Sequence, residues 1–293
     1  MRLVKQRTKI RIENYDSFTG AGLGKRKKRH GPLLPNTIRC IVCGPSNCGK
    51  TNLVFNLLFD PNGIRFKNIY VFSKSLYQPK YKFLAKVLPK EVGYFPFDDN
   101  SQVIHPSEAR PYSVMIFDDI ACEKHDNIRN YFVMGRHNNI DTFYLGQTYS
   151  KCPKQLIRDN TNLLILFKQD DMNLRHVYAD HVNTDMEYGK FKKMCAKAWN
   201  SAEYGFIVID KDSDIQNGRY RIGFDKYMRD LWWRGSIITR TRGVLLWFTR
   251  WDATDVIKQT KKRAIYSTGR ATVDQWACKG CTNWPYLMLK SVK

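Results

Sequence analysis

The chain contains no run of about 18 or more apolar residues, and this absence argues against a membrane-spanning helix. Its first residues, MRLVKQRTKIRIEN, lack the uninterrupted apolar segment of a secretory signal. Without such a signal, the eight cysteines indicate free thiols in a reducing compartment. We therefore expect an intracellular protein that is neither secreted nor bound to a membrane.

Acidic residues are scarce, because 27 Asp and Glu face 49 Lys and Arg, which gives a formal net charge of +22. The excess lies at the two ends: residues 1–30 carry +8, residues 231–293 carry +9, and residues 31–230 carry only +5. Basic ends can neutralise phosphates and release counterions, which favours a nucleic-acid partner. The alternative is that they only solubilise or address the protein.

Composition divides the chain into three parts. Residues 1–30 show no periodicity and predict a basic disordered arm, in which the cluster Lys25–Arg29 fits a nuclear-import signal or a phosphate contact. Residues 31–230 have the pattern of one globular domain. Residues 231–293 form a basic tail of unknown fold that holds six of the seven tryptophans.

Short apolar runs alternate with helical segments throughout the middle part. Strands are expected at 37–43, 68–72, 113–117, 142–145, 163–167 and 204–209. Helices are expected at 50–59, 81–88, 153–158, 173–181 and 185–199. A further helix is expected after the strand at 113–117 and runs to about residue 138. Continuous apolar strands separated by helices predict an α/β fold with a mainly parallel central sheet covered by helices on both faces.

A phosphate-binding loop follows the first expected strand. The residues that match the pattern G-x-x-x-x-G-K-[ST] are Gly44, Pro45, Ser46, Asn47, Cys48, Gly49, Lys50 and Thr51. The glycines let the backbone wrap phosphate oxygens, and the start of the next helix adds N–H donors. Lys50 would reach the β- and γ-phosphates of ATP, and the Thr51 hydroxyl would hold Mg²⁺.

Two acids end the expected strand at 113–117, as in a Walker B element. Asp118 would lie at the carboxyl edge of the sheet and hold Mg²⁺ there. Asp119 would orient or deprotonate the attacking water. The alternative is that the pair only caps the next helix.

Three further polar residues are catalytic candidates. Gln147 follows the strand at 142–145, where it could sense the γ-phosphate and position water. Arg158 ends the expected short helix at 153–158 and could reach the nucleotide of a neighbouring subunit. Arg136 is the competing candidate for this role, and the alternative for both arginines is a surface salt bridge.

Two Cys-x-x-Cys pairs suggest zinc but do not support it. Cys40 and Cys43 are three residues apart on one strand, so their side chains should point to opposite faces. Cys278 and Cys281 supply only two ligands. We therefore expect no zinc site.

Taken together, these motifs resemble the FtsK–HerA superfamily, and more closely the poxvirus-type genome-packaging ATPases of large DNA viruses, adintoviruses and Maverick/Polinton elements. The resemblance covers about residues 38–227. The stretches that carry it are GPSNCGKTNLVFNLL, SKSLYQPKYKFL, VMIFDDIACEKHDNIRNYFVMGRH, DTFYLGQTYSKCPKQLIRDNTNLLILFKQD and YGFIVIDKDSDIQNGRYRIGF.

The resemblance implies a RecA-like sheet, a homo-oligomeric ring and ATP-driven movement of double-stranded DNA into a capsid. Its partners would include a capsid or portal-vertex protein, and its location would be the virion or the host nucleus. It makes Gln147 the polar sensor and Arg158 the candidate arginine finger. The superfamily usually has Glu where this chain has Asp119, so Glu123 or another acid could assist.

Two other functions stay open at this point. One is a helicase or another DNA-remodelling ATPase built on the same core. The other is a DNA-binding scaffold protein that does not hydrolyse ATP. The unmatched tail favours the scaffold, whereas the intact Lys50, Thr51 and Asp118 argue against it.

Overall fold

The computed structural model describes residues 28–120, 126–229, 237–241 and 244–248. The chain divides into two compact units, Met1–Arg229 and Asp230–Lys293. The predicted disordered arm, up to residue 27, and the tryptophans of the tail lie outside the residues whose side chains are described.

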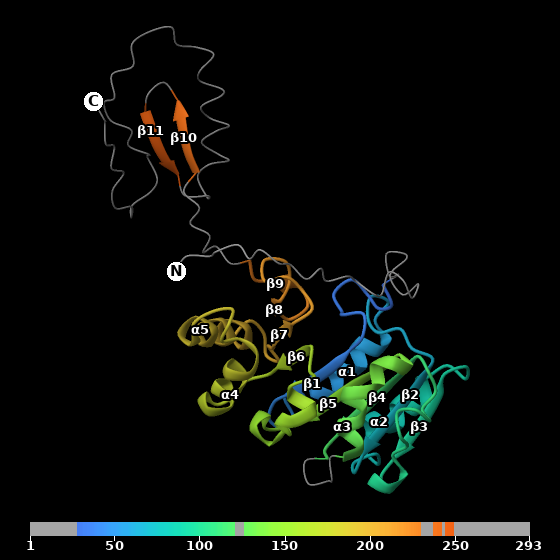
Figure 1. The fold of residues 1–293 in the computed structure, drawn as a ribbon. Helices are drawn as coiled ribbons and strands as arrows, with labels where there is room; N and C mark the ends of the chain where they lie inside the picture. Colours follow the sequence, from blue (N-terminus) through green and yellow to red (C-terminus); the bar gives the residue numbers. More distant parts are fainter. Residues whose placement is uncertain (1–27, 121–125, 230–236, 242–243, 249–293) are drawn as a thin grey trace, which may run out of the picture. The chain divides into compact units, whose positions relative to one another are not determined.

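In the described part of the first unit, nine strands form one sheet in the order β3-β2-β4-β5-β1-β6-β7-β8-β9 (Figure 1). The strands are β1 (Arg39–Cys43), β2 (Asn68–Ser73), β3 (Gly93–Phe97), β4 (Ser113–Asp118), β5 (Ile140–Gly146), β6 (Leu163–Leu166), β7 (Ile207–Asp210), β8 (Tyr220–Ile222) and β9 (Lys226–Tyr227). Strands β1 to β6 are mutually parallel. The predicted α/β class is confirmed.

Helices cover both faces of this sheet, as predicted. They are α1 (Lys50–Phe59), α2 (Pro79–Val87), α3 (Asp126–Met134), α4 (Asp171–His181) and α5 (Tyr188–Trp199). The buried side chains of α1 and α2 pack into one core, and those of α3, α4 and α5 pack into another. Strand β1 explains why: Cys40 and Val42 face the first core, whereas Ile41 and Cys43 face the second. A central strand buried on both faces is apolar throughout.

Three differences from the sequence prediction concern the edges. Strand β7 is antiparallel to β6, so the sheet is parallel over six strands only. The edge strand β3 was missed because its sequence, GYFPF, is short and contains a proline. Strands β8 and β9 were missed because they have only three and two residues.

The predicted helix at 153–158 is instead one irregular turn, Lys154–Arg158. Gln155 and Leu156 have non-helical dihedral angles, and Leu156 has a φ of 69°. The buried Ile157 and the contact of Arg158 with Asp180 hold this turn, so tertiary contacts override the local helical pattern.

The second unit contains two strands, β10 (Ile237–Thr241) and β11 (Val244–Phe248), that pair antiparallel. This pairing was not predicted from the sequence. In the parts of the chain that the structure describes, no helix has the length and apolar character that crossing a bilayer requires.

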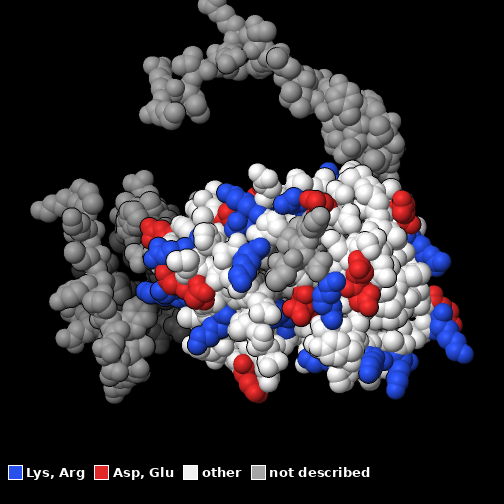
Figure 2. Space-filling view, turned by 90° about the horizontal axis from the view of Figure 1, so that it is seen from below, with Lys and Arg blue, Asp and Glu red and all other residues white. Residues whose placement is uncertain are grey.

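Charged side chains are interspersed on the described surface that Figure 2 shows. Lys and Arg alternate with Asp and Glu in this view and do not gather into one basic field. This agrees with the net charge of +5 for residues 31–230.

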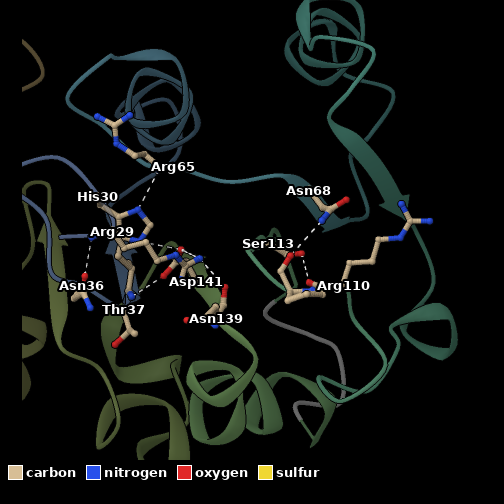
Figure 3. Close-up of polar contacts among 12 residues, drawn as sticks. Arg29, His30, Asn36, Thr37, Arg65, Asn68, Arg110, Ser113, Asn139 and Asp141 are labelled. Atoms are coloured by element: carbon tan, nitrogen blue, oxygen red, sulfur yellow. Dashed lines mark hydrogen bonds and ion pairs between the residues drawn. The ribbon is translucent and has the colours of Figure 1, made fainter. Parts of the chain in front are cut away.

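Arg29 and His30, the last residues of the predicted arm, belong to the folded domain (Figure 3). They meet the buried Asp141 near the start of β5: Arg29 Nη2 donates to Asp141 Oδ2 at 2.8 Å, and His30 Nε2 lies 3.1 Å from the same oxygen. The chain is thus fixed to the amino edge of the parallel strands just before β1.

Candidate nucleotide-binding site

The candidate site lies where three neighbouring parallel strands end. Strand β5 lies between β1 and β4. The register pairs Cys43 with Gly146 and Asp118 with Leu145, so the last residues of these strands share one edge. Loops that follow parallel strands meet at this carboxyl edge, which is where α/β sheets bind ligands.

The phosphate-binding loop needs its two glycines for different reasons. A methyl group built on Gly44 would lie 2.6 Å from Cys48 Sγ and 2.6 Å from Phe167 Cβ, so no side chain fits there. Gly49 has a φ of 100°, in the left-handed region that favours glycine. Helix α1 begins directly afterwards, so its first N–H groups are available to phosphate oxygens.

Lys50 lies folded over this loop. Its Nζ donates to the carbonyl oxygens of Gly44 at 2.7 Å and Pro45 at 2.8 Å. Its Nζ also lies 4.0 Å from Cys48 Sγ. An ammonium group held by neutral groups of the loop can exchange them for phosphate oxygens.

The two predicted metal ligands lie next to each other. Thr51 Oγ1 donates to Asp118 Oδ2 at 3.4 Å. Mg²⁺ prefers oxygen ligands and usually takes one or two carboxylates together with water and phosphate oxygens. A hydroxyl and a carboxylate at this edge therefore fit the ion.

Tyr81 also donates a hydrogen bond to Asp118 Oδ2 from its phenol. Burial raises the pKa of Asp118, and the hydrogen bond from Tyr81 and the charge of Lys50 oppose that shift. Burial and the charge of Asp118 raise the pKa of Tyr81 far above its ordinary value, so the phenol keeps its proton. Sequence reasoning missed Tyr81, because a tyrosine on an amphipathic helix carries no signal of a polar contact.

A cleft of about 170 Å³ opens over the loop and contains most of the predicted site. Its lining residues are Ser46, Asn47, Gly49, Lys50, Thr51, Ser75, Gln78, Lys80, Asp118, Asp119, Leu145 and Gln147. The structure thus brings the loop together with the two acids and with Gln147. The segment between β2 and α2 contributes Ser75, Gln78 and Lys80, which sequence reasoning missed because their loop lacks a motif.

Asp119 has an unusual backbone conformation beside this cleft. Its φ of 56° is in the left-handed region, although it is not glycine, and its side chain is exposed. Such conformations cost on the order of 1–3 kcal/mol and gather at functional sites.

Neither candidate arginine is among the residues that line the described cleft. Arg158 Nη1 bonds Asp180 Oδ2 at 2.7 Å, and its guanidinium carbon lies 5.1 Å from the centre of the Tyr149 ring. Arg136 lies in the turn Gly135–Asn138, which leads into the start of β5 and thus to the opposite edge.

Cys40 and Cys43 have the opposite orientations that their spacing on one strand predicts. They point to opposite cores, and burial raises the pKa of both thiols. In the described residues, no group of three or more His, Cys, Asp or Glu could hold a metal ion. Cys278, Cys281 and Glu123 lie outside the described residues.

The strands and the loop together define an α/β fold of the RecA-like type that contains a phosphate-binding loop. Strand β1 leads into the phosphate-binding loop and α1, and β4 ends in Asp118 beyond the intervening β5.

Comparison with known proteins gives distant likenesses. No protein-family model matches the chain. The chaperone protein ClpB of Clostridium tetani (strain Massachusetts / E88) is 32% identical over 96 residues, which is 32% of this chain and 10% of ClpB. The chain therefore spans a tenth of the length of that relative.

Among solved structures, the genome packaging NTPase B204 of Sulfolobus turreted icosahedral virus 2, in complex with sulfate, has a TM-score of 0.45 and 16% identity. That match covers 62% of this chain and 94% of B204. Thermomonospora curvata EccC (ATPases 2 and 3), in complex with a signal sequence peptide, has a TM-score of 0.31 and 12% identity, over 47% of this chain and 31% of EccC. The assignment of the fold depends on the strands and the loop described above.

Proposed function

We propose that the chain is an ATPase that hydrolyses ATP with Mg²⁺ in the cleft at the carboxyl edge. One observation carries this proposal: Thr51 and Asp118 lie in hydrogen-bond contact, and Lys50, Asp119 and Gln147 line the same cleft. A purely structural turn would not need an acid, an amide and an ammonium group around one phosphate-binding loop.

Each side chain has a defined task in this proposal. The N–H groups of the loop and Lys50 hold the β- and γ-phosphates. Asp119 and Gln147 orient a water molecule, which attacks the γ-phosphorus and breaks its bond to the β-phosphate oxygen. ADP and phosphate leave, and Asp119 accepts the proton of the water. Thr51 and Asp118 would hold Mg²⁺, which would supply positive charge to neutralise the phosphate oxygens.

We further propose that hydrolysis moves double-stranded DNA. The basic ends support this proposal, because they carry +8 and +9 and the middle of the chain carries +5. The resemblance of the motifs supports a homo-oligomeric ring that packages a viral or virus-like transposon genome with a capsid or portal-vertex protein. The site of action would be the virion or the host nucleus. In such a ring Arg158 would release its contact with Asp180 and contact the nucleotide bound by a neighbouring subunit.

Phosphate release by the full chain, with Mg²⁺ and with or without linear double-stranded DNA, tests both proposals. DNA should stimulate hydrolysis. Lys50→Ala should slow it by at least about 10³-fold, because several kcal/mol of transition-state stabilisation is lost. Its melting temperature should stay unchanged. The matched control is Lys226→Ala, which removes an exposed lysine from β9.

Three results would contradict the proposals. Near wild-type hydrolysis by Lys50→Ala would show that the site is wrongly assigned. Strand displacement without association to a capsid would favour a helicase. Absence of hydrolysis by the wild-type chain, with DNA present, would favour a DNA-binding scaffold.

A further inference from the structure

Tyr81 is a buried residue that contacts the proposed metal site without being among the residues that line the cleft. It is the third residue of α2, its side chain is 2% exposed, and its phenol bonds Asp118 Oδ2. The hydrogen bonds that Asp118 accepts from described side chains, those of Tyr81 and Thr51, both go to Oδ2. They fix the rotation of the carboxylate and leave Oδ1 for water or an ion.

The ring of Tyr81 packs against α1, the helix that follows the phosphate-binding loop. Phe55, on α1, meets it edge to plane, with ring centroids 5.9 Å apart and an interplanar angle of 76°. Since α1 begins with Lys50 and Thr51, the helix that presents the metal-binding hydroxyl also positions the tyrosine. Aromatic pairs in this arrangement stabilise one another beyond their burial.

The segment between β2 and α2 connects this contact to the wall of the cleft. Ser73 ends β2 opposite Asp118 in the register of the sheet, and its Oγ accepts a hydrogen bond from Ser75 N at 3.1 Å. Ser75 lines the cleft, and so do Gln78 and Lys80 just before Tyr81. A displacement of Tyr81 would therefore change both the wall of the cleft and the carboxylate of Asp118.

We propose that Tyr81 is a positioning residue that holds Asp118 in the orientation needed to bind Mg²⁺ with the nucleotide. The inference rests on the proposed ATPase function. It adds Tyr81 as a residue that determines the affinity of the proposed site for Mg²⁺. Outer partners of metal ligands typically change metal affinity by about 10–100-fold when they are removed. Tyr81 acts through Asp118 and touches no phosphate.

The test uses Tyr81→Phe in the full chain, because this change removes one hydroxyl and keeps the ring against Phe55. The affinity for a fluorescent ATP analogue is measured with EDTA and across a Mg²⁺ titration. We expect the Mg²⁺ concentration for half-maximal binding to rise about 10-fold or more. The affinity measured in EDTA should change less than about twofold, because the loop and Lys50 bind phosphates without the metal.

A matched control separates positioning from stability. Tyr220→Phe removes another buried phenol that bonds a carboxylate, Asp185 Oδ2 at 2.6 Å, outside the cleft. It should leave the Mg²⁺ titration unchanged. An equal shift in Tyr81→Phe and Tyr220→Phe would overturn the proposal, and so would no shift in Tyr81→Phe.

A double-mutant cycle tests whether Tyr81 acts through Asp118. In an Asp118→Asn background, Tyr81→Phe should have no further effect on the Mg²⁺ titration, since the two residues act as one unit. Additive effects would overturn the proposal. If the wild-type chain binds the analogue equally with and without Mg²⁺, the proposed function fails, and the role of Tyr81 fails with it. A normal Mg²⁺ response in both the wild type and Tyr81→Phe would refute the inference alone.

Discussion

Two aspartates on neighbouring strands of one sheet have opposite surroundings. Asp141, at the amino edge on β5, is fully buried and meets Arg29 and His30 (Figure 3). It also accepts a hydrogen bond from the N–H of Ile38. Asp118, at the carboxyl edge on β4, meets two hydroxyls and lines an open cleft. The same type of side chain thus stabilises the fold at one edge of the sheet and faces the candidate ligand cleft at the other.

The difference lies in how the charge of each carboxylate is compensated. Arg29 and the Ile38 N–H stabilise both oxygens of Asp141, so this group needs nothing from outside the chain. Asp118 is bonded by neutral donors at one oxygen, and burial raises its pKa. A partly buried carboxylate without a full countercharge gains most from a cation, which supports the proposal that the carboxyl edge is the site of chemistry.

The largest effect that we expect outside the loop concerns Arg158. If it stabilises charge on a neighbour's nucleotide, Arg158→Ala should bind ATP normally and hydrolyse it on the order of 10³-fold more slowly. Mixed with Lys50→Ala subunits, it should regain part of the activity, because some intact loops then face an intact Arg158.

Asp180→Asn is the control, because it removes the partner of Arg158 and keeps the arginine itself. Hydrolysis should survive this change. A mixture that co-assembles and has no more activity than either mutant would mean that Arg158 is structural. Arg136 would then become the candidate.

Asp141→Asn should lower the free energy of unfolding by roughly 3 kcal/mol, because it leaves the Arg29 side chain, which is 11% exposed, without its countercharge. Urea unfolding measures the change. The control is Asp126→Asn, whose pair with Arg129 at 3.0 Å is on the surface and should contribute less than about 1 kcal/mol. Equal losses in the two variants would contradict a structural role for the amino edge.

We expect His181 to make the free energy of unfolding depend on pH, which is a smaller effect. Its Nε2 lies 2.8 Å from the Tyr149 hydroxyl and its Nδ1 lies 3.4 Å from Lys211 Nζ, with Asp180 and Arg158 nearby. Burial lowers the pKa of His181 to about 4. Since the unfolded chain takes up the proton near pH 6.5, stability should fall as the pH drops from 6.5 to 4, by about 3 kcal/mol at most.

Urea unfolding at several pH values between 4 and 7 measures this loss. His181→Gln should flatten the curve in this window. His176→Gln removes an exposed histidine from the same helix and should leave the slope unchanged. A slope that persists in His181→Gln would assign the effect to another group.

The sequence predicted the parts of the molecule in which local pattern and tertiary contact agree. The central strands are continuous apolar runs because both of their faces are buried, and Gly44 and Gly49 are required by packing and by a positive φ. Asp118 was predicted to be a metal ligand, and the structure brings it to Thr51.

Other features could not be predicted, because distant parts of the chain determine them. The contact of Tyr81 with Asp118 requires the packing of α2 on α1, which no local pattern encodes. The turn at Lys154–Arg158 has a helical sequence but is held by Asp180 on α4. Strand β7 is antiparallel to β6 and follows it after two helices, α4 and α5, and the apolar run of the strand does not encode its direction.

The measurement that tests the central claim most directly is the thermal shift caused by MgATP, compared with ATP in EDTA. It is made on the wild-type chain, Asp118→Asn and Asp141→Asn. Ligands that bind only the folded state raise its melting temperature. We predict that Asp118→Asn melts like the wild type and loses the Mg²⁺-dependent part of the shift. Asp141→Asn should melt at a lower temperature and keep that part. A Mg²⁺-dependent shift that survives in Asp118→Asn and disappears in Asp141→Asn, or one absent from the wild type, would contradict the account.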